Sequence, residues 1–195
     1  MGPLLFGLVA FFAVHSLRVW GEPWRGRQVA AMGPGAWKLA YSVASMVGLA
    51  LLVWGYAQAR VGSPVLWTPP PAFRMITAVL VLVSFVLFAS SGVNGRIKAK
   101  LGHPMTLGVK TWSAAHLFSN GSLADVLLFG SFLAWSVLVF SAARRRDRAG
   151  GIGAGVSRPA GRWSADALAA VIGAVAWFAF ARWGHRWLIG VSPMG

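Results

Sequence analysis

Residues 72–92, AFRMITAVLVLVSFVLFASSG, decide the class of fold. Apart from Arg74 near its start, this stretch carries no charged residue, and most of its side chains are apolar. An α-helix needs roughly 20 such residues to cross the hydrocarbon core of a bilayer. The stretch therefore predicts a transmembrane helix.

Blocks of similar length recur along the rest of the chain. Four apolar blocks lie at residues 3–20, 36–58, 123–142 and 165–189. A sixth block, residues 104–120, is more polar, but its length and the Asn120-Gly121 break after it predict a helical hairpin with the next block. We therefore expect an all-α integral membrane protein: a six-transmembrane-helix bundle formed by a single membrane domain over residues 1–195.

The composition agrees with this class of protein. Of the 195 residues, 57% are hydrophobic and only 11% are charged, whereas a soluble domain carries about a quarter charged residues. The net charge of +14 comes from cations in the short segments between apolar blocks, which is typical of a membrane topology signal rather than of a nucleic-acid surface. We expect membrane lipid as a partner and no nucleic acid.

The basic residues also predict an orientation. They concentrate in the first, third and fifth connections, and the fifth, residues 143–163, is a basic, Gly-rich loop. The positive-inside rule places these three connections in the cytoplasm. Both termini are then expected on the outer, periplasmic side.

Polar groups inside the spans are the functional candidates. The chain has no cysteine, so any haem is bound non-covalently and thiolate ligation of a metal is excluded. An ionisable side chain at bilayer depth is costly unless it is paired or lines a cavity. The histidines and arginines of the predicted spans are therefore considered individually.

His15 lies in the first predicted span, with Phe11 and Phe12 about one turn before it and Arg18 about one turn after it. This pattern fits a flat, hydrophobic, dianionic ligand such as haem, because the imidazole can bind iron, the aromatic rings can contact the macrocycle and Arg18 can neutralise a propionate. The alternative is a histidine that is hydrogen-bonded to a neighbouring helix beside an arginine that extends to the interface.

His116 lies in the fourth predicted span, and its helical face carries Trp112, Ser113, Ser119 and Asn120. So polar a stripe in a membrane helix is expected to face the interior of the bundle. A structural hydrogen-bond cluster explains the stripe as well as metal ligation does, and both interpretations stay open.

The other two histidines lie near predicted span ends. His103 precedes Pro104, a start signal for a helix, so we expect it at the N-cap, where a propionate or another anion could bind; the alternative is a simple interfacial cap. His185 is interpreted as an interfacial anchor in the last span, although its expected depth matches that of His116. Depth alone does not choose a pair of ligands.

Taken together, these motifs resemble those of the NnrU family of bacterial membrane proteins. The order is His15-Ser16-x-Arg18, Gly-His-Pro-Met-x-x-Gly over residues 102–108, Trp112-x-x-x-His116 followed by Asn120-Gly121, an Arg-rich stretch with Asp147, and a terminal His-Arg-Trp-Leu-Ile-Gly-Val-Ser-Pro segment. The resemblance covers nearly the whole chain. It implies a multi-pass protein of the bacterial inner membrane.

The resemblance also implies two kinds of function. NnrU proteins are associated with denitrification, where they support nitrite and nitric oxide reduction. The family is similar to the plastid zeta-carotene isomerase, which uses haem b to isomerise a cis double bond in a polyene, and whose axial histidines carry over onto His15 and His116. The cysteine of that enzyme's second motif falls on Ser113, so thiolate ligand switching cannot operate here.

These considerations predict one haem b between the first and fourth spans. His15 and His116 are its expected axial ligands, Arg18 neutralises a propionate, and His103 is a second site for a propionate or a substrate. Phe11, Phe12 and Trp112 would line a pocket for an apolar polyene. The enzymatic alternative is an S-adenosylmethionine-dependent methyltransferase of the isoprenylcysteine or phospholipid type, because the His103-Pro104 turn resembles the Arg-His-Pro motif of those enzymes. The non-enzymatic alternative is an assembly partner of respiratory nitrogen-oxide enzymes.

Overall fold

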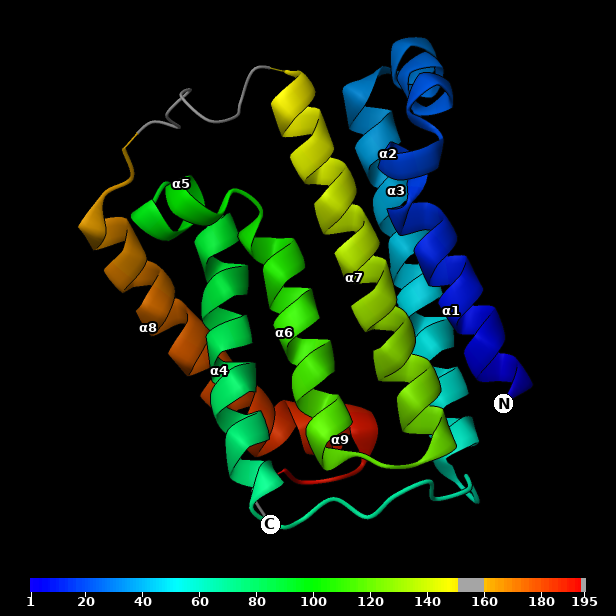
Figure 1. Ribbon diagram of the computed structural model, residues 1–195. Coiled ribbons are helices and arrows are strands. Elements are labelled where there is room, and N and C mark those ends of the chain that lie inside the picture. The colour runs from blue at the N-terminus through cyan, green and yellow to red at the C-terminus, as the bar shows by residue number, and fades with distance from the viewer. Residues whose placement is uncertain (151–159, 194–195) are drawn as a thin grey trace. The chain divides into compact units, whose positions relative to one another are not determined.

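The computed structural model describes residues 1–150 and 160–193. Every regular element in these ranges is helical (Figure 1), which confirms the all-α class. The chain forms two compact units, Met1–Val65 with Ser122–Ala124, and Leu66–Gly121 with Asp125–Gly195. We call them the first and the second unit and describe each by itself.

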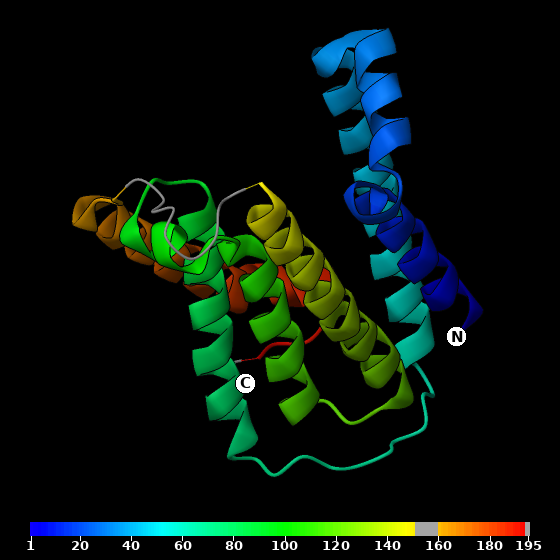
Figure 2. The same ribbon diagram turned by 45° about the horizontal axis from the view of Figure 1, so that its top comes forward.

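The first unit is built from a short apolar helix packed along a long one. Its elements are α1 (Gly2–His15), α2 (Leu17–Trp20) and α3 (Glu22–Arg60). In Figures 1 and 2, α1 runs antiparallel to the second half of α3. Gly7 and Gly55 allow this approach, because a Cβ atom would lie 2.7 Å from the Leu52 Cα at Gly7 and 2.5 Å from the Pro3 carbonyl oxygen at Gly55. Small residues at such crossings allow membrane helices to pack backbone against backbone.

A kink divides α3 near its first third. Gly33 has φ 83° and ψ 159°, a conformation outside the helical region, and Pro34 follows it. Glycine adopts positive φ without the steric cost that a Cβ imposes. The kink redirects the chain between the first turns of α3 and the part that packs on α1.

The second unit contains α4 (Phe73–Ser91), α5 (Arg96–Leu101), α6 (Pro104–Ser119), α7 (Leu123–Ala149) from Asp125 on, α8 (Trp163–Ala179), the π-helical turn η1 (Phe180–Gly184) and α9 (His185–Ile189). Helix α4 packs against both α6 and α8. The buried Ser84 hydroxyl donates to the Gly108 carbonyl at 2.7 Å, and a Cβ at Gly173 would lie 2.6 Å from the Val86 Cα. Interhelical hydrogen bonds and small residues thus hold α4 against both neighbours.

The short helix α5 is held in place by a carboxylate from α8. Asp166 accepts hydrogen bonds from the backbone N–H groups of Arg96, at 3.0 Å, and of Ile97, at 3.1 Å. These are first-turn N–H groups that have no partner within their own helix. The Arg96 guanidinium also lies 4.1 Å from the centre of the Trp163 ring, so α5 and the start of α8 form one connected corner.

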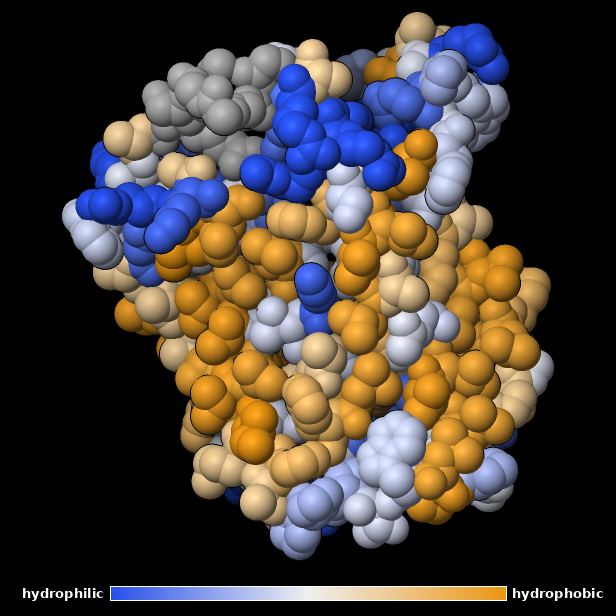
Figure 3. Space-filling view, viewed as in Figure 1, coloured by the Kyte–Doolittle hydropathy of each residue, from blue (hydrophilic) through white to orange (hydrophobic). Residues whose placement is uncertain are grey.

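Four described helical stretches are long and apolar enough to cross a membrane: Glu22–Arg60, Phe73–Ser91, Leu123–Ala149 and Trp163–Ile189. Many of their apolar side chains are exposed, including Leu39, Val79 and Val171, as expected for surfaces that face lipid. In Figure 3, hydrophobic side chains cover the helices below the hydrophilic end of α7. The chain is thus a membrane protein, whereas six spans and the outward position of both termini stay predictions.

Three local features differ from the sequence-based expectation. The first predicted span is interrupted, because α1 ends at His15 and α2 begins at Leu17. The basic loop expected at 143–163 begins later, since α7 continues to Ala149; arginine and alanine are good helix formers, and cations are favourable at a helix C-terminus. Residues 151–159 of that loop lie outside the described residues. Helix α5 and the π-helical turn η1 were not expected.

Candidate functional site

His15 is the last residue of α1, and a backbone hydrogen bond fixes its ring. Its Nδ1 donates to the carbonyl oxygen of Phe11, one turn earlier, at 2.8 Å. The ring stacks on that of Phe11, with centroids 3.9 Å apart, and the Tyr41 ring lies edge-on at 5.7 Å. Because a carbonyl oxygen only accepts, Nδ1 carries the hydrogen, and Nε2 carries the lone pair in the neutral imidazole.

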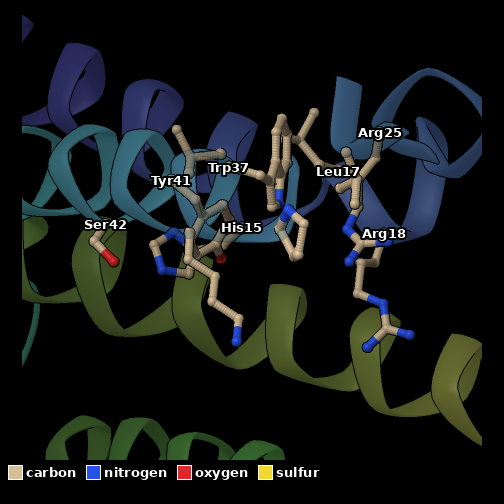
Figure 4. A pocket seen from close by; sticks show the side chains of 11 residues that line it. His15, Leu17, Arg18, Arg25, Trp37, Tyr41 and Ser42 are labelled. Atoms are coloured by element: carbon tan, nitrogen blue, oxygen red, sulfur yellow. The ribbon is translucent and has the colours of Figure 1, made fainter. Parts of the chain in front are cut away.

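A pocket of about 480 Å³ lies beside His15, within the first unit (Figure 4). In Figure 4, the His15, Trp37 and Tyr41 side chains lie toward one end of the pocket, and Arg18 and Arg25 lie toward the other. The complete lining is Val14, His15, Leu17, Arg18, Arg25, Val29, Pro34, Trp37, Lys38, Tyr41 and Ser42. The pocket thus combines an imidazole, aromatic rings and three cations.

Glu22 lies next to two of these cations. Its carboxylate accepts a hydrogen bond from Arg25 at 2.9 Å and lies 3.8 Å from Arg18. No acidic side chain is among the residues that line the pocket. With Glu22 included, Arg18, Arg25 and Lys38 leave two net positive charges, a surplus suited to a ligand with two negative charges.

His116 repeats the hydrogen-bond arrangement of His15 in the second unit. Its Nδ1 donates to the carbonyl oxygen of Trp112, one turn earlier, at 2.9 Å. The ring stacks on Phe129 of α7, with centroids 4.6 Å apart, and Trp112 contacts both Phe129 and Phe132 edge-on. Two members of the polar stripe of α6, Trp112 and His116, therefore contact a neighbouring helix, and the same tautomer places the lone pair of His116 on Nε2.

The remaining members of the stripe are occupied by local hydrogen bonds. The buried Ser113 hydroxyl bonds to the carbonyl oxygens of Val109, at 2.8 Å, and Lys110, at 3.1 Å. The Asn120 amide donates to the His116 carbonyl at 2.8 Å. The hydrogen-bond interpretation thus applies to Ser113 and Asn120, while ligation of a metal by His116 stays a prediction.

His185 and Asp125 lie within electrostatic range of the His116 ring. His185 follows the π-helical turn η1, and its Nδ1 donates to the Val191 carbonyl at 2.7 Å. The sequence assigned His185 to the interface and did not single out Asp125; the matched depth of His116 and His185 was the signal that could have connected them. In the described residues, no three histidine, cysteine, aspartate or glutamate side chains cluster as a metal site, whereas haem iron needs only one or two protein ligands.

His103 is the N-cap residue of α6, as predicted, with Pro104 at the start of the helix. Its side chain does not cap its own helix but reaches α7, where Nε2 lies 2.9 Å from the Asp147 carboxylate. The Phe140 ring lies edge-on at 6.2 Å. The carboxylate nearest to this histidine is thus one that the chain itself supplies, and an external anion at His103 stays a prediction.

The predicted site residues belong to two different units. His15 and Arg18 lie together in the first unit, whereas His103 and His116 lie in the second. Ligation of one haem by His15 and His116 therefore stays a prediction. Arg25, Trp37 and Lys38 also line the pocket beside His15, a role that the sequence did not predict.

The helices expose apolar surfaces and carry polar side chains where they contact one another. These features define an integral membrane protein with candidate ligand sites inside its helical units. The chain belongs to the NnrU family, because the sequence model of the NnrU protein family matches residues 3–193. This confirms the resemblance inferred from the motifs. No curated protein and no solved structure is significantly similar to the chain.

Proposed function

We propose that this NnrU-family protein binds haem b in the bacterial inner membrane, with His15 and His116 as axial ligands. Arg18 holds a propionate, and His103 is a second site for a propionate or substrate. The observation that carries the proposal is the shared arrangement of the two histidines. In each, Nδ1 donates to the carbonyl oxygen one turn earlier, at 2.8 Å for His15 and 2.9 Å for His116.

This arrangement fits iron ligation for a physical reason. A backbone acceptor at Nδ1 fixes the neutral tautomer, orients the ring and raises the basicity of Nε2, as such partners do for metal-ligating histidines in general. Aromatic rings flank both imidazoles, Phe11 and Tyr41 at His15 and Phe129 and Trp112 at His116. Such walls contact a flat macrocycle and exclude water.

Bound haem b supplies a redox-active iron in an apolar environment. The residues of the chain hold it, keep water away and present an apolar wall to a second molecule. An apolar polyene that is isomerised, or a role in supporting nitrite and nitric oxide reduction, fits this environment. The chain has no cysteine and therefore offers no thiolate to exchange for a histidine; the hydroxyl of Ser113 is bonded to backbone carbonyls of its own helix.

The test is the pyridine haemochrome spectrum of the detergent-purified protein, expressed with added haem precursor. Wild type is expected to contain near-stoichiometric haem b. His15→Ala and His116→Ala are expected to lose haem or change its spin state, and His103→Ala and His185→Ala, as matched histidine controls, are expected to keep the ligation. Folded wild type without haem would overturn the proposal.

A colourless protein would direct attention to the two alternatives. Thermal stabilisation by S-adenosylmethionine, lost in His103→Ala, would indicate methyl transfer near the His103-Pro104 turn. Co-purification with a nitrogen-oxide reductase would indicate an assembly role.

A further inference from the structure

The kink of α3 brings cations from distant positions into one pocket. On a straight helix, Arg25 and Lys38 would lie about 20 Å apart along the axis, at about 1.5 Å per residue. The positive φ of Gly33 redirects the chain between them, and both side chains line the pocket beside His15. The Trp24 and Trp37 rings, equally distant in sequence, lie in contact with centroids 5.9 Å apart.

The charges around the pocket select a class of ligand. Arg18, Arg25 and Lys38 contribute three positive charges, and Glu22 neutralises one of them. The aromatic rings of Trp37 and Tyr41 line the same pocket, toward the end opposite Arg18 and Arg25 (Figure 4). A ligand that is complementary to such a pocket is flat and apolar and carries two carboxylates.

We propose that Arg25 and Lys38, together with Arg18, bind the two propionate carboxylates of the porphyrin, and that this recognition does not depend on the iron. The proposal rests on the proposed function and assigns the carboxylate-binding residues of the same site. The pocket volume of about 480 Å³ lies within the range of about 300–1,000 Å³ that is usual for small-molecule sites. Guanidinium and ammonium groups form charge-assisted hydrogen bonds with carboxylates.

Iron-free porphyrin separates carboxylate binding from iron ligation. The detergent-purified, haem-free protein is titrated with protoporphyrin IX and with its dimethyl ester, and binding is followed by porphyrin fluorescence. The free acid is expected to bind wild type about tenfold or more tightly than the ester, because only the acid offers charged acceptors. The double variant Arg25→Gln/Lys38→Gln is expected to lose most of that preference and to bind the ester as wild type does.

Two further variants each change a single charge of α3. Arg27→Gln removes an exposed cation of the same helix that does not line the pocket, and it is expected to keep the preference for the free acid. Glu22→Gln leaves the cations in place and raises the local surplus of positive charge, so it is expected to bind the free acid more tightly. This gain also tests the proposal if the double variant does not fold.

The outcomes distinguish this inference from the proposed function. His15→Ala is expected to keep the acid-over-ester preference of iron-free porphyrin while losing haem ligation. An unchanged preference in Arg25→Gln/Lys38→Gln, an equal loss in Arg27→Gln, or no gain in Glu22→Gln would overturn the carboxylate assignment. Wild type that shows the preference for the free acid but never ligates haem iron would instead overturn the proposed function and leave the pocket assignment standing.

Discussion

The close approach of α1 to α3 at Gly7 gives a stability prediction that follows directly from the geometry. A Cβ at this position would lie 2.7 Å from the Leu52 Cα and 2.8 Å from the Leu52 nitrogen. Carbon atoms in optimal contact lie about 3.5–4.0 Å apart, so Gly7→Ala forces the two helices apart by about 1 Å. Overpacking of this kind costs about 1–3 kcal/mol.

The assay is thermal unfolding in detergent, followed by circular dichroism, with Gly2→Ala as the matched control. Gly2 lies in the same helix, and nothing lies within 4 Å of the Cβ that alanine would add there. A loss of 1 kcal/mol lowers the Tm of a protein of this size by about 2–4 °C, so Gly7→Ala is expected to unfold about 2–12 °C below Gly2→Ala. His15 is the last residue of α1, so a shift of this helix also moves His15. The porphyrin affinity of Gly7→Ala is therefore expected to be lower than that of Gly2→Ala. Equal Tm values for the two variants would refute the close packing.

Three other predictions concern the second unit. Asp166→Ala removes the acceptor of the Arg96 and Ile97 N–H groups. It is expected to lower the free energy of unfolding by about 1–2 kcal/mol, as loss of an N-cap does, and to give a lower Tm than Asp166→Asn. His103→Ala and Asp147→Ala are expected to be coupled by about 0.5–2 kcal/mol in a double-mutant cycle, because their side chains lie 2.9 Å apart and both are less than a third exposed; additive effects would contradict the pair. His185→Ala is expected to shift the reduction potential of bound haem without lowering the haem content of the protein. A loss of haem as large as that in His116→Ala would indicate instead that His185 is a ligand.

The helical fold could be predicted because its signal is local. Hydropathy and length identify the long helices, and Pro104 and Asn120 mark both ends of α6 within one residue. The extension of α7 to Ala149 was missed because hydropathy falls at the arginines, whereas their helix propensity does not.

The candidate site could be predicted only in part. His15 and His116 were found because an ionisable group in an apolar helix is visible in the sequence. The approach of Arg25 and Lys38 was not visible, since it depends on the backbone direction at Gly33. The contact between His103 and Asp147 joins residues of different helices, and one sequence contains no signal for such a pairing.

The most direct test of haem ligation by His15 and His116 is electron paramagnetic resonance of the oxidised, haem-reconstituted protein. Wild type is expected to give a low-spin spectrum typical of two imidazole ligands. His15→Ala and His116→Ala are each expected to give a high-spin spectrum that returns to low spin when free imidazole is added. A wild-type low-spin spectrum that persists in either single variant would contradict the assignment of that histidine, and persistence in both would contradict haem ligation by His15 and His116.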